Sequence, residues 1–522
     1  MMTMIEQLGA PAEAVQLAFV AFTLATYALI GFVTRTGSPG DYFVAGRRVP
    51  PRYNGMAVAA QWTSLTVFLG LTGTQYALGY DGLAYVIGLV GGFVLMAVLI
   101  VPYLRKLGAT TVSDLFAARY GMFHRLLAVV VLIVASTAIL IAQFYGIGLI
   151  ASRFLGVPYE WAVAGACAVV VMSTLLGGMR GATGTQAAQY IVLIFAALVP
   201  AAWLSFKSLG WPLPQLVYGE ALQQIAALET GMIEKGLASA DTLKPHVAPF
   251  LQLDPLNFAA IIFCIMTGVA SFPHLLTQYF AVPTVRDARL SVAWTAFFAL
   301  LLAMTIPAYA ALAKLEVYRL IEKGTAITDL PPWMESMSRL DLVRVHGVSM
   351  RMMTDAAAAA KAGAADASTV ALHLKSHAPE TFAGFAQLKE TVKAALVEAA
   401  QSTGSLADAQ QWDTFRQSVL PAAAKAAGNK TGMLTENGLW IEPASLVLAL
   451  PKMSGMPAIV MGLVVAGALA AALATASGVL MAIANALSHD IYYKLLDRKA
   501  PNGRRLAISR VLLLAVAGGA AY

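Results

Sequence analysis

The sequence predicts an all-α polytopic membrane protein, and three observations support this fold class. Of its 522 residues, 59% are hydrophobic and 12% are charged, whereas about a quarter of the residues in a typical soluble domain are charged. The apolar residues gather in runs that are long enough to cross a bilayer, which takes about 20 residues. The basic residues gather in the short loops between these runs. The net charge of +7 therefore calls for no nucleic-acid partner, and the lipid bilayer is the expected environment.

Ten apolar runs are expected to form spanning helices. They lie at residues 13–34, 53–79, 82–103, 126–152, 159–177, 186–206, 256–280, 288–313, 456–488 and 506–522. Arg and Lys collect in the loops after the first, third, fifth, seventh and ninth runs. The positive-inside rule places these loops in the cytoplasm. We therefore expect a multi-pass protein of the cell inner membrane with its N-terminus outside.

Two long connections, residues 207–255 and 314–445, fall on the outer side in this scheme. The second has nearly balanced charges, and its Ala-rich runs at 355–366 and 390–400 predict solvated helices. We therefore expect an outer loop at 207–255 and an extracytoplasmic helical insertion at 314–445. The last run, 506–522, stops without a polar flank, so either the last helix is short or the chain is a fragment; we favour the fragment.

The run from Ile459 to Leu487 carries no charged residue and is rich in Ala and Gly. Small residues let neighbouring helices approach closely. Thr475, Ser477 and Asn485 are embedded in this run, and polar groups inside a membrane bundle need partners. The hydroxyls can bond to carbonyls of their own helix, or they can hold an ion.

Polar residues and a proline interrupt two other runs. The run at 53–79 contains Gln61, Thr63, Ser64 and Thr66, and the run at 256–280 contains Gly268, Ser271, Pro273, His274 and Gln278. A proline removes a helical hydrogen bond and kinks or breaks its helix. Freed backbone groups at membrane depth are tolerated where they line a cavity. Each run alone is also compatible with a kinked structural helix.

The positions of the two interrupted runs favour the broken-helix interpretation. The first opens a series of five runs at 53–206, and the second opens another series at 256–522. Because the first series has an odd number of spans, the second is inverted in the membrane. Broken first helices in two inverted repeats are how secondary transporters build a site at the bilayer midplane. The run at 13–34 is then an extra N-terminal helix.

Motifs typical of enzymes are missing. The chain has no H-E-x-x-H, G-x-S-x-G or Walker sequence and no clustered His and Cys ligands. His489 and Asp490 lie side by side at the end of an apolar run, and we interpret them as a helix-end anchor rather than a metal site. We expect no enzyme activity and no organic cofactor.

Four stretches resemble the sodium/solute symporter family, and within it the branch similar to acetate/cation symporters. They are DYFVAGR (41–47), GGMRGATGTQAAQ (177–189), FPHLLTQYFAVPTVRDARLSVAW (272–294) and ASGVLMAIANALSHDIYYK (476–494). The resemblance implies the leucine-transporter fold, with two inverted five-helix repeats after an extra N-terminal helix. On that scheme the second repeat lacks its final helix, and sodium is the coupling ion.

The resemblance also implies a sodium site. When the family's sodium ligands are transferred to the matching positions of this sequence, we expect the carbonyls of Ala60 and Thr63 to face the carbonyl of Ala471 and the hydroxyl of Thr475. A hard cation prefers such oxygen ligands.

The chain departs from the family pattern at three positions of this region. Family members usually carry two hydroxyl residues where this chain has Ala474 and Thr475, and Ser477 is the candidate replacement. Relatives that transport proline have an aspartate where Trp62 stands, and proline and sugar carriers have one at Gln186. Because this chain lacks these carboxylates, two alternatives to ordinary sodium coupling stay open: sodium binds more weakly, or protons replace sodium as the coupling ion.

The substrate hypothesis combines the acetate-type resemblance with the expected half-helix N-termini, which attract anions. We expect a carboxylate to be oriented by Gln61, Ser64, Ser271 and His274. Gly268 belongs to the expected break in the run at 256–280 and to the same substrate site. Trp62 or Phe272 is expected to bound the apolar tail of the substrate. For His274, a packing role between helices is an equal alternative.

The sequence therefore predicts a sodium-coupled symporter of a small monocarboxylate such as acetate, working by alternating access. Its partners are a small organic acid and sodium. The alternatives are the solute-sensing membrane module of a sensor kinase, or a proton-coupled or inactive homologue.

Overall fold

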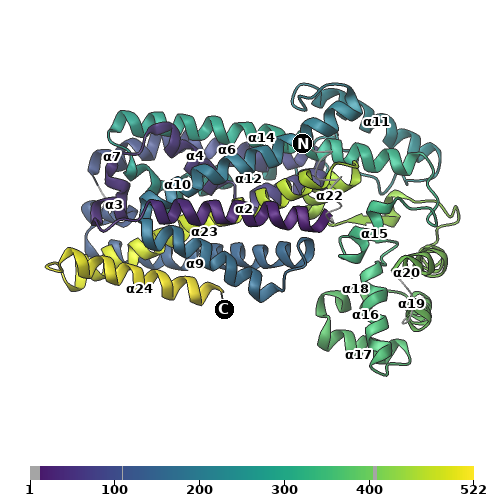
Figure 1. Cartoon of the computed structure of the whole chain (residues 1–522). Coiled ribbons are helices and arrows are strands. Elements are labelled where there is room, and N and C mark those ends of the chain that lie inside the picture. Colours follow the sequence, from purple (N-terminus) through teal and green to yellow (C-terminus); the bar gives the residue numbers. More distant parts are fainter. Residues whose placement is uncertain (1–11, 109, 404–407, 522) are drawn as a thin grey trace.

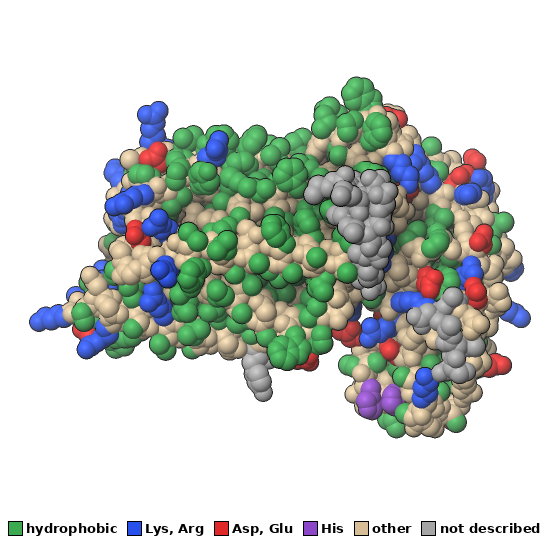
Figure 2. Space-filling model, viewed as in Figure 1, with side chains coloured by type: hydrophobic (Ala, Val, Ile, Leu, Met, Phe, Trp, Pro, Cys, Tyr) green, Lys and Arg blue, Asp and Glu red, His purple; other side chains and the backbone are tan. Residues whose placement is uncertain are grey.

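The computed structural model describes residues 12–108, 110–403 and 408–521. Long helices lie roughly side by side in a bundle, and a group of short helices projects from one end of it (Figure 1). We call this the insertion end. At the opposite end, Lys and Arg side chains gather around the helix termini, whereas apolar side chains cover the flank of the bundle between the two ends (Figure 2). We call this opposite end the basic end.

The first half of the chain builds most of the bundle. Its elements are α2 (Ala12–Val33), α3 (Pro39–Val44), α4 (Pro51–Trp62), η2 (Thr66–Gly70), α5 (Leu71–Leu78), α6 (Leu83–Leu95), η4 (Met96–Ile100), α7 (Val101–Leu107), α8 (Val112–Tyr120), α9 (Met122–Phe154) and α10 (Tyr159–Leu209). The runs expected at 159–177 and 186–206 belong to one element, α10, which is broken at Gly178 (φ 56°, ψ −141°). Only glycine adopts this conformation easily.

The second half adds the remaining bundle helices. They are α12 (Pro255–Ser271), α13 (Pro273–Gln278), α14 (Val285–Glu322), α22 (Leu446–Met453), α23 (Ala458–Asn485), η9 (Ala486–Leu496) and α24 (Asn502–Ala521). The small-residue helix α23 packs against α2, α4, α9 and α10, and all but three of its 28 residues are buried. It is the central helix of the bundle.

Six helical segments among the described residues are long and apolar enough to cross a membrane, and the α12–α13 pair, bent by 42°, makes a seventh. Five of the six are longer than the roughly 20 residues that one crossing requires, and two of them each cover two of the expected runs. The segment Thr66–Leu107 has 42 residues and Tyr159–Leu209 has 51.

The insertion end holds both long connections. The first contains α11 (Tyr218–Glu234), and the second contains α15 (Pro332–Arg339), α16 (Met350–Lys361), α17 (Ala367–His377), α18 (Pro379–Ala386), α19 (Glu390–Thr403), α20 (Asp408–Thr414) and α21 (Leu420–Ala426). A short antiparallel ribbon, β1 (Val343–Val345) with β2 (Leu439–Ile441), closes the second connection. The sequence predicted only helices here, because three-residue strands are too short to show an alternating pattern.

Helix α14 continues to Glu322, beyond residue 314, where we expected the insertion to begin. Lys314 is only 7% exposed, and its ammonium group donates to the Tyr76 carbonyl at 3.1 Å. We expected a polar loop to begin at Lys314 because its side chain is charged. The structure buries this charge and satisfies it with a carbonyl, so the helix continues through Lys314.

Candidate functional site

The first expected break is present between α4 and η2. Helix α4 ends at Trp62, and Thr63 has non-helical backbone angles (φ −76°, ψ 60°). The Ser64 N–H donates to the Trp62 carbonyl at 2.8 Å instead of reaching the Ala60 carbonyl four residues earlier. The Val67 N–H donates to the Ser64 hydroxyl at 3.3 Å. The carbonyls of Ala60 and Thr63 are thereby released from the helical pattern.

Two other helices supply polar partners to this break. The Leu65 N–H donates to the side-chain oxygen of Gln143 on α9 at 3.2 Å. The Thr475 hydroxyl of α23 donates to the Gln61 carbonyl at 2.7 Å. Backbone groups that the break exposes at membrane depth are thus satisfied by side chains from other helices, as a nonaqueous environment requires.

The second expected break is also present, at Phe272. Helix α12 ends at Ser271, Phe272 is extended (φ −60°, ψ 115°), and α13 begins at Pro273. The Phe272 ring stacks on the His274 ring with centroids 5.4 Å apart. His274 is 4% exposed, and its Nδ1 has no hydrogen-bond partner among the residues that the structure describes. The break therefore carries an imidazole nitrogen that is available to a ligand.

The four residues expected to hold sodium lie on α23 and at the end of α4, two elements that touch. Ala60, Thr63, Ala471 and Thr475 are each at most 2% exposed. The Thr475 hydroxyl is 3.1 Å from the Ala471 carbonyl as well as bonded to the Gln61 carbonyl. The structure therefore brings carbonyl and hydroxyl oxygens together at this contact.

Ser477 lies in a network of buried amides beside this contact. The Gln61 amide donates to the side-chain oxygens of Gln186 at 2.9 Å and Gln278 at 3.3 Å. Gln186 donates to the Ser477 hydroxyl at 3.0 Å, and Gln278 donates to the Thr183 hydroxyl at 2.6 Å. Four helical elements are thereby tied together through neutral polar groups.

A cavity of about 470 Å³ opens between the two breaks. Its wall includes most of the residues expected to bind substrate. They are Gln61, Trp62, Ser64, Phe272 and His274, together with Thr475 from the expected sodium site. Apolar side chains such as Tyr85, Leu89, Ile139 and Ile265 form much of the remainder. Among the described residues, no Asp, Glu, Lys or Arg lines this cavity.

Two residues expected at the substrate site lie elsewhere. Ser271 is exposed, and its hydroxyl donates back to the carbonyls of Thr267 and Gly268 at 3.0 and 2.9 Å. Neither Ser271 nor Gly268 is part of the cavity wall. Both precede the break and lie in the helical part of α12.

The sequence reasoning missed Gln143. It lines the cavity, is 2% exposed and supports the first break through Leu65. A single amide within the apolar run 126–152 was the signal, because polar residues inside spans are usually functional.

Comparison with known proteins decides the family. The model of the sodium:solute symporter family matches residues 42–315. An uncharacterized symporter of Cupriavidus necator is 31% identical over 615 aligned positions, which cover all of this chain and 78% of that protein. The chain belongs to the sodium:solute symporter family.

The solved structure of a Na⁺-coupled sialic acid symporter, in a substrate-bound outward-open state, shows the same fold. The TM-score is 0.61, and the match covers 97% of this chain and 81% of that chain at 16% identity. The leucine-transporter fold that the sequence predicted is thus confirmed. As a family member, this protein is a multi-pass, sodium-coupled solute symporter, and the family is one of transporters rather than enzymes.

Proposed function

We propose that this symporter carries a small monocarboxylate, such as acetate, across the cell inner membrane together with sodium by alternating access. One observation supports this most directly. Thr475 lines the solute cavity and also donates to the backbone at the first break. The proposed cation site and the proposed solute site therefore share a wall.

The charge balance of the cavity supports an anion that enters with a cation. A carboxylate buried without a positive partner is strongly disfavoured, and the described part of the chain supplies no Lys or Arg to the cavity wall. A sodium ion held by the oxygens of Ala60, Thr63, Ala471 and Thr475 supplies the missing charge. Each ion then lowers the cost of burying the other, and this mutual dependence is what couples their transport.

The donors for the carboxylate are the Ser64 hydroxyl and the His274 ring. The amide N–H groups of Gln61 already donate to Gln186 and Gln278, so in this proposal Gln61 positions its neighbours. Trp62 and Phe272 bound the carbon tail. The cavity is roomier than acetate requires, and its apolar walls also suit propionate or pyruvate. An amino acid fits less well, because no carboxylate of the wall faces its ammonium group.

One sodium ion that enters with one monocarboxylate anion carries no net charge, so the membrane potential does no work on this pair. The sodium concentration gradient drives the transport, because a tenfold gradient supplies about 1.4 kcal/mol and supports a substrate gradient of about tenfold. A second sodium ion would add about 2.3 kcal/mol at 100 mV. In the proposed cycle the bound cation favours the outward-open arrangement, which receives the acid.

The test is uptake of radiolabelled acetate into proteoliposomes that contain the purified protein. We expect an inward sodium gradient to raise the initial rate at least tenfold over equal sodium on both sides. Propionate and pyruvate should compete. Uptake that follows a proton gradient with sodium absent would assign the coupling to protons, and binding without uptake would favour the sensor alternative.

A further inference from the structure

A second cavity, of about 420 Å³, lies at the basic end of the bundle. It is bounded by α8, the start of α9 and the end of η9. The residues that matter for its chemistry are Asp114, Met122, Arg125, Tyr493, Lys494 and Arg498. The solute cavity between the two helix breaks shares none of these residues.

Positive charge dominates this cavity. Three cationic side chains and one carboxylate line it, and the carboxylate already has partners. Asp114 accepts from Arg125 at 2.8 Å and from the Thr110 N–H at 3.1 Å. Arg125 is 8% exposed, and within residues 12–108, 110–403 and 408–521 its Nε has no hydrogen-bond partner. Among the charged side chains that line the cavity, positive charges exceed negative ones by two.

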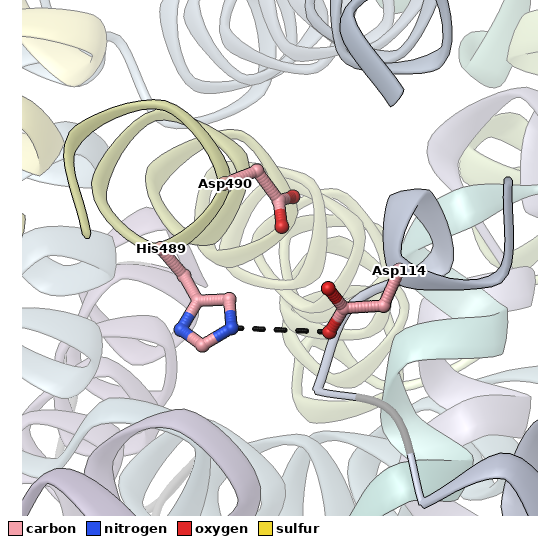
Figure 3. A group of neighbouring side chains, drawn as sticks. All are labelled: Asp114, His489 and Asp490. Carbon is pink, nitrogen blue, oxygen red and sulfur yellow. Dashed lines mark ion pairs between the residues drawn. The ribbon is translucent and has the colours of Figure 1, made fainter. Parts of the chain in front are cut away.

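The acidic groups beside this cavity do not make it a cation site. The Nε2 atom of His489 lies 3.8 Å from a carboxylate oxygen of Asp114, and Asp490 is adjacent (Figure 3). One potential ligand atom from each of the three residues lies within 4.8 Å of the other two. However, Asp490 accepts hydrogen bonds from the hydroxyls of Thr111 and Ser113. A divalent cation there would also lie beside the Arg125 guanidinium. The excess positive charge of the neighbouring cavity favours an anion instead.

An apolar surface continues from this cavity along α9. Met122, Phe123, Leu126, Leu127 and Val130 are 40% to 72% exposed, and the segment that they begin is one of those apolar enough to cross a membrane. A soluble anion would have no use for such a surface. An anionic phospholipid would use both parts, since its phosphate prefers basic groups and its acyl chains prefer apolar side chains.

We propose that this cavity binds the phosphate of an anionic phospholipid, with the acyl chains lying along the exposed apolar face at the start of α9. The phosphate bridges Arg125 on α9 and the Lys494–Arg498 segment at the end of η9. Bound lipid thereby holds α8, α9 and η9 together at the basic end. In the orientation expected from the basic loops, this end faces the cytoplasmic leaflet, where anionic lipid is attracted to basic segments.

The experiment uses the full chain in neutral detergent and compares phosphatidylglycerol with phosphatidylcholine of the same acyl chains. Native mass spectrometry gives the affinity for each lipid, and thermal unfolding gives the shift in midpoint. We expect phosphatidylglycerol to bind in preference and to raise the midpoint. Neutralising each basic residue should weaken its binding by roughly fivefold, so Lys494→Gln with Arg498→Gln should weaken it by about 25-fold.

Lys499→Gln is the matched control, because Lys499 is an exposed basic residue of the same loop that does not line the cavity. It should change the affinity less than twofold. Arg125 is left intact, since its loss would leave Asp114 buried without its cation. Should the double variant fail to fold, the wild-type protein still tests the proposal. Its preference for phosphatidylglycerol should fall as salt is raised, because salt screens the attraction.

Three results would overturn the proposal. The first is equal binding of the two lipids by the wild-type protein. The second is a loss in Lys499→Gln as large as in the double variant. The third is a midpoint shift by millimolar inorganic phosphate that equals the lipid effect, because that would assign the cavity to a soluble phosphate.

Discussion

The hydroxyl of Thr475 on α23 donates a 2.7 Å hydrogen bond to the carbonyl of Gln61, which precedes it by 414 positions. Gln61 stands one residue before the end of α4, so the central helix of the bundle contacts the first break directly. The same hydroxyl lines the solute cavity. This single side chain therefore links helix packing, the proposed cation site and the proposed solute site.

Replacing Thr475 with Val tests this link, because Val keeps the side-chain shape and removes the hydroxyl. The Gln61 carbonyl would lose its donor, and sodium would lose a ligand. A buried polar group without its partner costs about 1–3 kcal/mol, so the sodium concentration for half-maximal uptake should rise at least about fivefold. Thr475→Ser keeps the hydroxyl and should stay near wild type. Equal sodium dependence of the two variants would exclude Thr475 as a ligand.

Gly478→Ala tests the amide network of Gln61, Gln186 and Gln278, because Gly478 packs against the Gln61 side chain. A Cβ at Gly478 would overlap the side-chain oxygen of Gln61, so Gln61 must move and its bonds to Gln186 and Gln278 must lengthen or break. Overpacking of a core costs about 1–3 kcal/mol. We expect a lower unfolding midpoint and at least a tenfold lower uptake rate.

Gly518→Ala is the control for this substitution. Gly518 also lies in a helix of the bundle, but a Cβ there meets no atom within 4 Å. The unfolding midpoint and the uptake rate of the Gly518→Ala variant should match those of the wild-type protein. If Gly478→Ala also behaves like wild type, Gln61 is not held in the position that the network requires.

Much of the fold could be predicted because the decisive signals are local. The proline at 273 and the polar cluster at 61–66 each mark a break within one segment, and the small residues of 459–487 mark a tightly packed helix. The structure places the second break at Phe272, and Gly268 and Ser271 precede it in helix. Proline restricts the backbone of the residue before it, which is Phe272.

The rest of the site depends on contacts between distant segments. Gln61 meets Gln186 across 125 positions and Gln278 across 217. No spacing rule relates three amides on different helices, so the sequence showed each as an isolated polar residue. Gln143 was overlooked for the same reason, because its partner is a backbone N–H that becomes available only where the first helix breaks.

His274 carries the next prediction. Its unpartnered Nδ1 and its stacking on Phe272 leave the imidazole facing the cavity. His274→Ala should raise the KM for acetate by about tenfold, since a hydrogen bond to a charged group contributes about 1.5–3 kcal/mol. His274→Gln keeps an N–H donor and should lie between Ala and wild type. Uptake of His274→Ala with unchanged KM would leave this histidine with a packing role.

The last prediction concerns His246 in the first long connection, at the insertion end. Its backbone N–H donates to Glu229 at 2.9 Å, and its Nδ1 lies 3.3 Å from the Lys314 ammonium group. Burial and, secondarily, the charge of Lys314 lower the pKa of His246 to about 3. A buried neutral imidazole in this position accepts from Lys314, and a proton on Nδ1 would place two cations in contact.

The sign of the pH effect follows from this lowered pKa. Between pH 6.5 and about 3, the unfolded loop binds a proton that the folded loop does not, so folding stability is lost as the pH falls. From pH 7.5 to pH 5 this amounts to about 2 kcal/mol. Burial raises the pKa values of Glu229 and Glu436, which favours folding at lower pH and therefore opposes the effect of His246.

A comparison with His246→Asn separates the two effects, because Asn keeps an acceptor for Lys314 and both carboxylates remain. Hydrogen exchange of the backbone amides at 243–250 should report the local opening. After correction for the intrinsic exchange rates, the protection factors of these amides in the wild-type protein should fall by about 30-fold more between pH 7.5 and pH 5 than those in the variant. Equal pH slopes in the two proteins would mean that His246 takes up its proton in the folded loop, where Lys314 would then have to turn away from it.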